Sequence, residues 1–189
     1  MKITILKEYG HNEALLGLGL SYGITSDVEL SAIDNFRLAD VALRLAPKDG
    51  GHNKFLESIQ VWLDVTAPRY WWQEADTYRL SSKQSASTMH TIGKRYLEQS
   101  DFAMPIDDTY LMKINELVAQ YGSTKTIESL IQLKNMLPEG FLQRRIWNVN
   151  YKVLRNIIQQ RQNHRLPEWR EFCHFIGENA EHKELLLSI

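Results

Sequence analysis

The sequence contains a single cysteine, Cys173, among 189 residues, so no disulfide can form within the chain. Disulfides belong mainly to oxidising compartments, and their exclusion here favours a reducing one such as the cytoplasm. The segment around this cysteine, EFCHFI, is apolar. We therefore predict that Cys173 is buried, because free cysteines usually are, and that it is not a reactive nucleophile.

Long apolar runs are also absent, since no stretch approaches the roughly 18 residues that a membrane-spanning helix needs. The N-terminal segment MKITILKEYG lacks the apolar core and cleavage site of a signal peptide. A formal net charge of -1 provides no basic field for nucleic acid and no acidic excess typical of disorder. We therefore expect a cytoplasmic protein that binds neither membranes nor nucleic acid.

The short motifs of common catalytic and nucleotide sites are missing too. The sequence has no P-loop, no GxGxxG after a strand and no GxSxG. Its six histidines are scattered and its cysteine is alone, so we predict no metal site. Hydrophobic residues make up 43% and charged residues 24%, which is ordinary for a globular protein, and the length predicts one domain over residues 1–189.

Hydrophobic spacing predicts an α+β fold. Apolar residues alternate with polar ones over residues 2–7 and 59–65, which indicates two strands. The serine-rich residues 81–87 predict a loop, either exposed to solvent or holding a small charged ligand. Helical patterns and capping residues predict helices over 13–22 with Asn12 as N-cap, from Ser26 to about 45, from Pro68 to about 75, over 109–121 ending at Gly122, over 124–136 with Thr124 as N-cap, over 148–163 and over 167–180.

Basic residues cluster late in the chain. On the predicted helix Lys152, Arg155 and Asn156 share a face, so this helix could present amide and guanidinium groups to a cleft. Arginine suits phosphates and planar carbonyl edges because it donates two parallel hydrogen bonds. The alternative is a solvated basic face paired with nearby glutamates. The basic residues of this cluster are Arg144, Arg145, Lys152, Arg155, Arg161, Arg165 and Arg170.

Two segments of this sequence contain motifs that resemble those of a known protein family. The first begins with Gly51-His52-x-x-x-Leu56-Glu57 and continues, after a strand, as PRYWWQEADTYRLSSKQSASTMH; the second is Leu137-Pro138 followed by EGFLQRRIWNVNYKVLRNIIQQR. The first resembles the GHxSxxEH turn and the SRxxxxQxxRHRxxSxxxxSxRY signature of the flavin-dependent thymidylate synthases, the ThyX family. The second resembles that family's LP and WTxNxRSLxNFxxxR helix, and PEWREFCHFIGE resembles its AQWEIR helix. The resemblance covers about residues 1–180.

Several positions depart from the family's pattern. The signature Arg-His-Arg is Thr77-Tyr78-Arg79 in this chain, and the closing Arg-Tyr is Met89-His90. Lys134 stands where the family has a phosphate-binding arginine, which keeps the charge but loses the bidentate fork. The chain is therefore similar to the family in pattern but divergent in its signature.

The resemblance implies a ThyX-like single domain with a small, mostly antiparallel sheet flanked by helices and a helical C-terminal half. It implies a homotetramer with ligand sites between subunits. It also implies reductive methylation of dUMP to dTMP, with FAD as cofactor and NADPH and methylenetetrahydrofolate as co-substrates. The protein would orient the cofactor and the small-molecule nucleotide and would need no nucleophile of its own.

Carried over by position, the resemblance assigns roles to residues of this sequence. Two of them would act in catalysis, with His52 near the flavin ring and Arg161 facing the pyrimidine carbonyl edge. The residues expected to bind the cofactor are His52, Arg79, Asn150, Lys152 and Asn156. Those expected to bind the substrate are Ser82, Ser87, Lys134 and Arg161.

Two alternatives remain open at the level of sequence. The altered signature could belong to a non-catalytic nucleotide-binding protein on the same fold. Alternatively, Tyr70, Trp71 and Trp72 could fill the cleft as core residues, or form a subunit interface, because large rings serve in both places.

Overall fold

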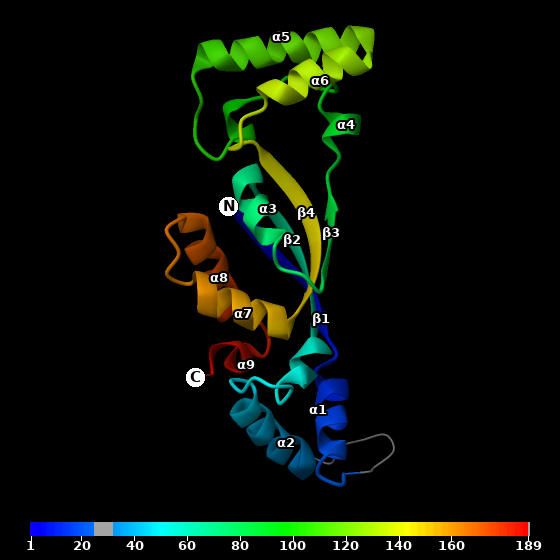
Figure 1. Cartoon of the computed structure of the whole chain (residues 1–189), viewed down its shortest axis with the longest axis vertical. Helices are drawn as coiled ribbons and strands as arrows, with labels where there is room; N and C mark the ends of the chain where they lie inside the picture. Colours follow the sequence, from blue (N-terminus) through cyan, green and yellow to red (C-terminus); the bar gives the residue numbers. More distant parts are fainter. Residues whose placement is uncertain (25–31, 189) are drawn as a thin grey trace. The chain divides into compact units, whose positions relative to one another are not determined.

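The computed structural model describes residues 1–24 and 32–188. Its fold is α+β, as predicted, with one antiparallel sheet in the strand order β1-β2-β4-β3 (Figure 1). The strands are β1 (Lys2–Tyr9), β2 (Gln60–Pro68), β3 (Ser81–Ser85) and β4 (Leu142–Asn150). The helices are α1 (His11–Leu20), α2 (Ala32–Leu45), α3 (Arg69–Ala75), α4 (Thr88–Thr91), α5 (Asp108–Thr124), α6 (Ile127–Met136), α7 (Tyr151–Arg161), α8 (Pro167–Asn179) and α9 (Lys183–Leu187), with 3₁₀ turns η1 (Lys54–Glu57) and η2 (Gln99–Asp101).

The sheet confirms two predicted strands and corrects two other segments. β1 and β2 lie where alternation placed them. β3 occupies residues 81–85 of the loop predicted for residues 81–87. β4 occupies residues that sequence reasoning left unassigned or gave to the helix over 148–163. Both segments are rich in polar or charged residues, so neither showed the clear alternation that identifies a half-buried strand.

Several helix boundaries differ from the predictions. α1 begins at His11 and not after Asn12, and it follows Gly10, whose φ of 92° suits glycine. A Cβ at Gly10 would lie 2.4 Å from the Ser58 carbonyl oxygen, so this close approach also requires glycine. α5 runs past Gly122 to Thr124, and the N-cap of α6 is Thr126. Ser26, the predicted start of the helix ending at Leu45, lies outside the described residues.

The chain divides into two compact units, and each strand contributes residues to both. Unit 1 consists of Met1–Lys2, Val65–Thr77 and Gln84–Arg145, and unit 2 of Ile3–Asp64, Tyr78–Lys83 and Ile146–Ile189. The expectation of one domain over the whole chain stays a prediction.

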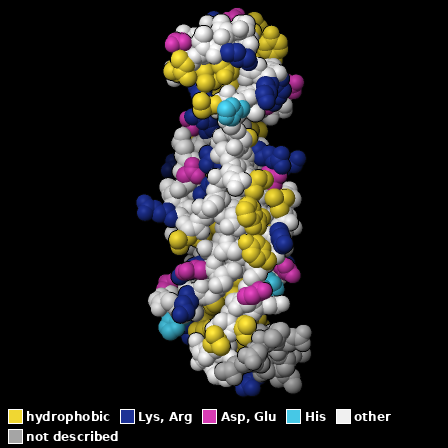
Figure 2. All heavy atoms as spheres, turned by 90° about the vertical axis from the view of Figure 1, so that its right-hand side faces the viewer, with side chains coloured by type: hydrophobic (Ala, Val, Ile, Leu, Met, Phe, Trp, Pro, Cys, Tyr) yellow, Lys and Arg dark blue, Asp and Glu magenta, His cyan; other side chains and the backbone are white. Residues whose placement is uncertain are grey.

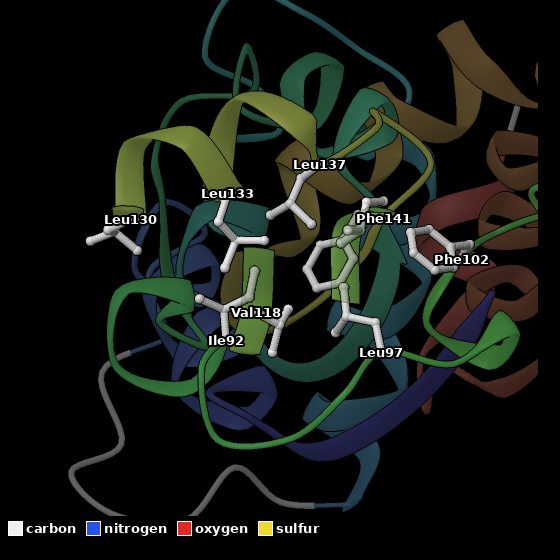
Figure 3. Packing of buried hydrophobic residues seen from close by; sticks show 9 residues of the cluster. Ile92, Leu97, Phe102, Val118, Leu130, Leu133, Leu137 and Phe141 are labelled. Carbon is white, nitrogen blue, oxygen red and sulfur yellow. The ribbon is translucent and has the colours of Figure 1, made fainter. Parts of the chain in front are cut away.

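Unit 1 has a hydrophobic core between α5, α6 and the segments that flank them. Figure 3 shows the side chains of this cluster, with Leu133 from α6 and Val118 from α5 among them. The rings of Phe102 and Phe141 meet edge to face with centroids 5.9 Å apart, and the two residues form an isolated β-bridge. The hydroxyl of Tyr110 donates to the carbonyl of Met136 (2.6 Å), which ties α5 to α6.

The aromatic run of α3 also belongs to the core of unit 1. Trp71 and Trp72 are fully buried and pack edge to face with centroids 4.9 Å apart. The indole Nε1 of Trp72 donates to the carbonyl of Gln143 (2.8 Å), and Arg145 lies over the Trp72 ring (4.5 Å). Of the uses left open for these rings, the structure therefore supports core packing for the two tryptophans.

Several large hydrophobic side chains on α5 and α6 are exposed. Met112, Ile127 and Ile131 each have more than half of their surface accessible. Figure 2 shows hydrophobic side chains gathered on the surface of these two helices (yellow, top). This surface remains available for contact with another molecule.

Unit 2 is organised around α7, which packs against α8 and α9 (Figure 1). The ring of Trp147, near the end of β4, stacks on Phe172 of α8 with centroids 5.6 Å apart. Arg155 of α7 is buried and donates to the carbonyls of Leu185 (3.1 Å) and Leu186 (3.0 Å), and to the hydroxyl (3.1 Å) and carbonyl of Ser188. The guanidinium therefore links α9 to α7 through hydrogen bonds. It is not part of the solvated basic face that the sequence left open.

Two stacked histidines join the start of α1 to the C-terminal segment. The rings of His11 and His182 are nearly parallel, with centroids 3.5 Å apart. Burial and the neighbouring His182 lower the pKa of His11, while Asn12, Glu184 and Glu181 partly oppose this shift. The stack therefore favours the neutral form of His11.

This arrangement predicts a loss of stability in acid. Below the usual pKa of 6.5, the unfolded chain takes up a proton at His11 that the folded chain resists, so the free energy of unfolding falls as the pH falls. We expect the urea midpoint of the wild type to drop between about pH 7.5 and about pH 5.5, and to drop less in His11→Gln. An equal drop in the variant would contradict this role for His11.

Candidate functional site

The candidate site residues of unit 2 lie on segments that α7 connects. At its start, Asn150 is buried and caps the helix, because its Oδ1 accepts from the Val153 N–H (3.0 Å). Its Nδ2 donates to the carbonyl of Leu80 (3.5 Å). Asn150 therefore joins the first turn of α7 to the segment between α3 and β3, and its amide is already hydrogen-bonded within the chain.

Residues 78–82, which include the start of β3, hold two exposed candidate residues on either side of Leu80. Arg79 and Ser82 are exposed, whereas Tyr78 is buried. Leu80 has a φ of 59°, a left-handed conformation that is uncommon for residues other than glycine. Strained backbone of this kind gathers at ligand sites, where the surrounding structure holds it in place.

The end of α7 meets the same segment through Tyr78. The Nε of Arg161 donates to the Tyr78 hydroxyl (2.8 Å), and its Nη1 lies 2.8 Å from Nε2 of His164. The guanidinium also lies over the rings of Trp169 (5.0 Å) and Tyr78 (5.7 Å). Arg161, the residue expected to face a pyrimidine, is thus held by side chains of its own unit.

A second link runs from α7 to the turn that carries His52. Lys152 pairs with Glu57 of η1 (2.6 Å), and both side chains are more than one third exposed. An ion pair this exposed adds little to stability, about 1 kcal/mol at most, so it leaves Lys152 free to exchange partners. His52 is exposed and lines a pocket of about 590 Å³ between α1 and the turn.

The remaining candidates differ in their surroundings. Asn156 is exposed on α7, and its Oδ1 accepts from Gln160 (3.0 Å). Ser87 and Lys134 are half-buried and belong to unit 1, Ser87 next to α4 and Lys134 on α6. In unit 2 the structure thus connects the segments that carry Arg79, Asn150, Lys152, Asn156, Arg161, Ser82 and His52 through α7.

The basic cluster does not form one surface. Arg155 is buried against the C-terminal carbonyls, Arg145 pairs with Asp76 (2.9 Å), and Arg170 donates to the carbonyl of His164 (2.7 Å). Each of these arginines has a structural partner. These three arginines therefore neither line one cleft nor form one solvated face, the two interpretations that the sequence left open.

Sequence reasoning missed two side chains that shape this site, Tyr78 and Gln160. Tyr78 appeared only as a departure from the family's signature, and Gln160 was not considered. For Gln160 the available signal was that it adjoins Arg161 in sequence. For Tyr78 it was only that the resemblance expects a histidine at this position.

Cys173 is buried, as predicted, with its Sγ 3.9 Å from the carbonyl of Ile157. Burial raises the pKa of this thiol to about 12, although Arg161 opposes the shift. We expect iodoacetamide to leave the folded protein unmodified at about pH 8 and to add one carbamidomethyl group after unfolding in urea, as measured by intact mass. Rapid labelling of the folded protein would contradict this expectation.

Within residues 1–24 and 32–188, no group of three or more His, Cys, Asp or Glu side chains could hold a metal ion. In the same part of the chain, no helix is both long and apolar enough to cross a membrane. The candidate residues of unit 2 offer hydrogen-bond donors from arginine, lysine, amide and imidazole groups.

In comparisons with known proteins, no family model and no curated protein matches this sequence. Solved structures do match it. A crystal structure of the flavin-dependent thymidylate synthase ThyX from Helicobacter pylori, complexed with FAD and dUMP, superimposes with a TM-score of 0.79 at 15% identity, covering 99% of this chain and 98% of that one. A second structure of ThyX from Helicobacter pylori with FAD and dUMP gives 0.77 at 16% identity, with the same coverage. The predicted ThyX-like fold is confirmed, and the matches cover 99% of the chain.

Proposed function

We propose that this protein binds FAD and a deoxyuridine nucleotide and catalyses the reductive methylation of dUMP to dTMP, with NADPH and methylenetetrahydrofolate as co-substrates. The observation that carries the proposal is the match of 99% of the chain to structures that hold FAD and dUMP. It is supported by exposed Arg79 and Asn156 on segments that α7 connects.

The donor set fits a flavin nucleotide. The exposed guanidinium of Arg79 suits a phosphate, and the Asn156 amide suits a carbonyl or phosphate oxygen. Lys152, once released from Glu57, adds a second positive charge, and exposed His52 offers a ring and a hydrogen bond. Bound FAD would supply the redox chemistry of the reaction.

The protein's own contribution is orientation and electrostatics. Arg79, Lys152 and Asn156 would hold the cofactor, with His52 beside it. Asn150, which is buried and bonded within the chain, would contribute by holding the segment that carries Arg79. Arg161 would approach the pyrimidine carbonyl edge in the orientation that Tyr78 and His164 impose. We also propose that Ser82, Ser87 and Lys134 contact the substrate.

Two measurements test it. Protein purified without added cofactor should show flavin absorption bands, or acquire them after incubation with FAD and desalting. With NADPH and methylenetetrahydrofolate it should convert dUMP to dTMP, detected by chromatography. A protein that stays colourless after incubation with FAD would end the flavin proposal.

One observation favours a second candidate, a non-catalytic nucleotide-binding protein. Thr77 caps the end of α3 through its hydroxyl (2.7 Å to Glu74 O), Tyr78 is engaged with Arg161, and Met89 is exposed. The resemblance expects cationic or imidazole groups at these positions. Each charge-assisted contact contributes about 1.5–3 kcal/mol, so their replacement would weaken phosphate binding strongly. Tight binding of a nucleotide without turnover would favour this candidate, and formation of dTMP would exclude it.

We further propose a homotetramer with ligand sites between subunits, in a reducing cytoplasm. The exposed hydrophobic side chains of α5 and α6 offer surface for subunit contacts. Light scattering after size exclusion should give about four times the chain mass of 22.0 kDa. A monomer at micromolar concentration would contradict the tetramer.

A further inference from the structure

A chain of three hydrogen bonds runs along one side of α7 and ends at Asn156. It begins at Arg161, whose Nε donates to the Tyr78 hydroxyl (2.8 Å). The Tyr78 hydroxyl donates to Oε1 of Gln160 (2.9 Å), and Nε2 of Gln160 donates to Oδ1 of Asn156 (3.0 Å). Gln160 and Asn156 are four residues apart, a spacing at which helical side chains meet.

The direction of this chain follows from chemistry. Arginine has no acceptor, so the bond between Arg161 and Tyr78 must be donated by the guanidinium. The single proton of the Tyr78 hydroxyl then needs an acceptor of its own, because this residue is 8% exposed and buried donors are nearly always paired. Oε1 of Gln160 is that acceptor.

The same logic fixes the two amides. Once Oε1 of Gln160 faces Tyr78, its Nε2 faces Asn156, which must accept through Oδ1. Because Oδ1 of Asn156 is bonded to Gln160, the group that this exposed amide can offer to a ligand is its Nδ2. Without the chain, an exposed asparagine presents its oxygen or its nitrogen equally well.

We infer that Tyr78 and Gln160 are positioning residues that orient the Asn156 amide, so that the site presents an N–H donor and selects an acceptor atom, a carbonyl or phosphate oxygen, in its ligand. The identity of that ligand as FAD or dUMP rests on the proposed function, whereas the orientation of the amide does not. Fixing the amide beforehand lowers the entropy lost on binding, which is the advantage of such a chain.

The orientation is tested first in the ligand-free protein. The Asn156 side-chain amide resonances are assigned in a ¹H–¹⁵N spectrum by their loss in Asn156→Ala. In Tyr78→Phe, which keeps the ring but removes the hydroxyl, we expect these resonances to move toward the values of a free amide. The matched control is Tyr110→Phe, which removes a hydroxyl bonded to Met136 in unit 1 and should leave them unchanged. Unchanged resonances in Tyr78→Phe would overturn the inference.

The consequence for binding is tested by a double-mutant cycle. Separate titrations with FAD, dUMP and inorganic phosphate identify which acceptor the amide meets. For that ligand, we expect Tyr78→Phe to raise Kd about fivefold in the wild-type background and to have little effect in the Asn156→Ala background. An equal effect in both backgrounds would show that Tyr78 does not act through Asn156, and would overturn the inference. If none of the three binds the wild type, the proposed function fails, and the spectra of the ligand-free protein still decide the orientation of the amide.

Discussion

Replacing Arg155 with alanine is expected to lower the free energy of unfolding by about 3 kcal/mol, because several buried acceptors lose their donor at once. Arg155 is 4% exposed, and its guanidinium bonds to the carbonyls of Leu185, Leu186 and Ser188 and to the Ser188 hydroxyl. Burial lowers the pKa of Arg155, while Asp49 partly opposes the shift. Its hydrogen bonds to the carbonyls offset only part of the desolvation of its charge.

Urea unfolding followed by circular dichroism measures the loss. Arg155→Lys should fall between wild type and alanine, because an ammonium lacks the planar fork that reaches acceptors on different residues. Arg165→Ala is the matched control, since the Arg165 side chain is exposed, and should change stability by less than about 0.5 kcal/mol. If Arg155→Ala lowers the free energy of unfolding no more than Arg165→Ala does, the contacts of Arg155 with the C-terminal segment do not stabilise unit 2.

Replacing Arg79 with alanine is expected to raise the Kd for FAD about 10-fold to 100-fold while leaving the thermal midpoint unchanged. The binding effect follows from one charge-assisted hydrogen bond to phosphate, worth about 1.5–3 kcal/mol. The side chain is exposed, so its removal should cost little stability. A raised Kd with an unchanged thermal midpoint would show that Arg79 contacts the ligand and does not stabilise the fold.

Flavin fluorescence titration measures this Kd. Arg79→Lys should recover part of the affinity, since it keeps the charge and loses the bidentate geometry. Arg165→Ala serves again as the control for loss of one positive charge. If the wild type binds FAD and Arg79→Ala binds it equally well, Arg79 lies outside the cofactor site.

Helices and apolar strands of this protein were predictable because their side chains follow a period. Alternation identified β1 and β2, and helical spacing placed α5, α6 and α8 within a few residues. β3 has the sequence SSKQS, in which no residue is apolar, and its position at one edge of the sheet demands little burial. Such a strand forms because its backbone pairs with β4, a tertiary effect that leaves no trace in local composition.

The helix that carries two of the candidate residues was predictable, but the contacts of those residues were not. The resemblance placed Asn156 and Arg161 on one helix, and the structure agrees. It could not reveal that Arg161 bonds to Tyr78, because those residues are 83 positions apart. Nor could helical spacing show that Arg155 faces inward to the C-terminal carbonyls, since that depends on where α9 ends.

The hydrogen bonds that join Tyr78 to Arg161 and to Gln160 limit how these three positions can change in evolution. Changing Tyr78 alone to histidine would shorten the side chain and disturb its hydrogen bonds to both Gln160 and Arg161. An intermediate sequence with only one of the three replaced would therefore be at a disadvantage. In homologues of this chain, we expect the identities at these three positions to vary together, and a homologue with histidine at position 78 to differ at position 160 as well.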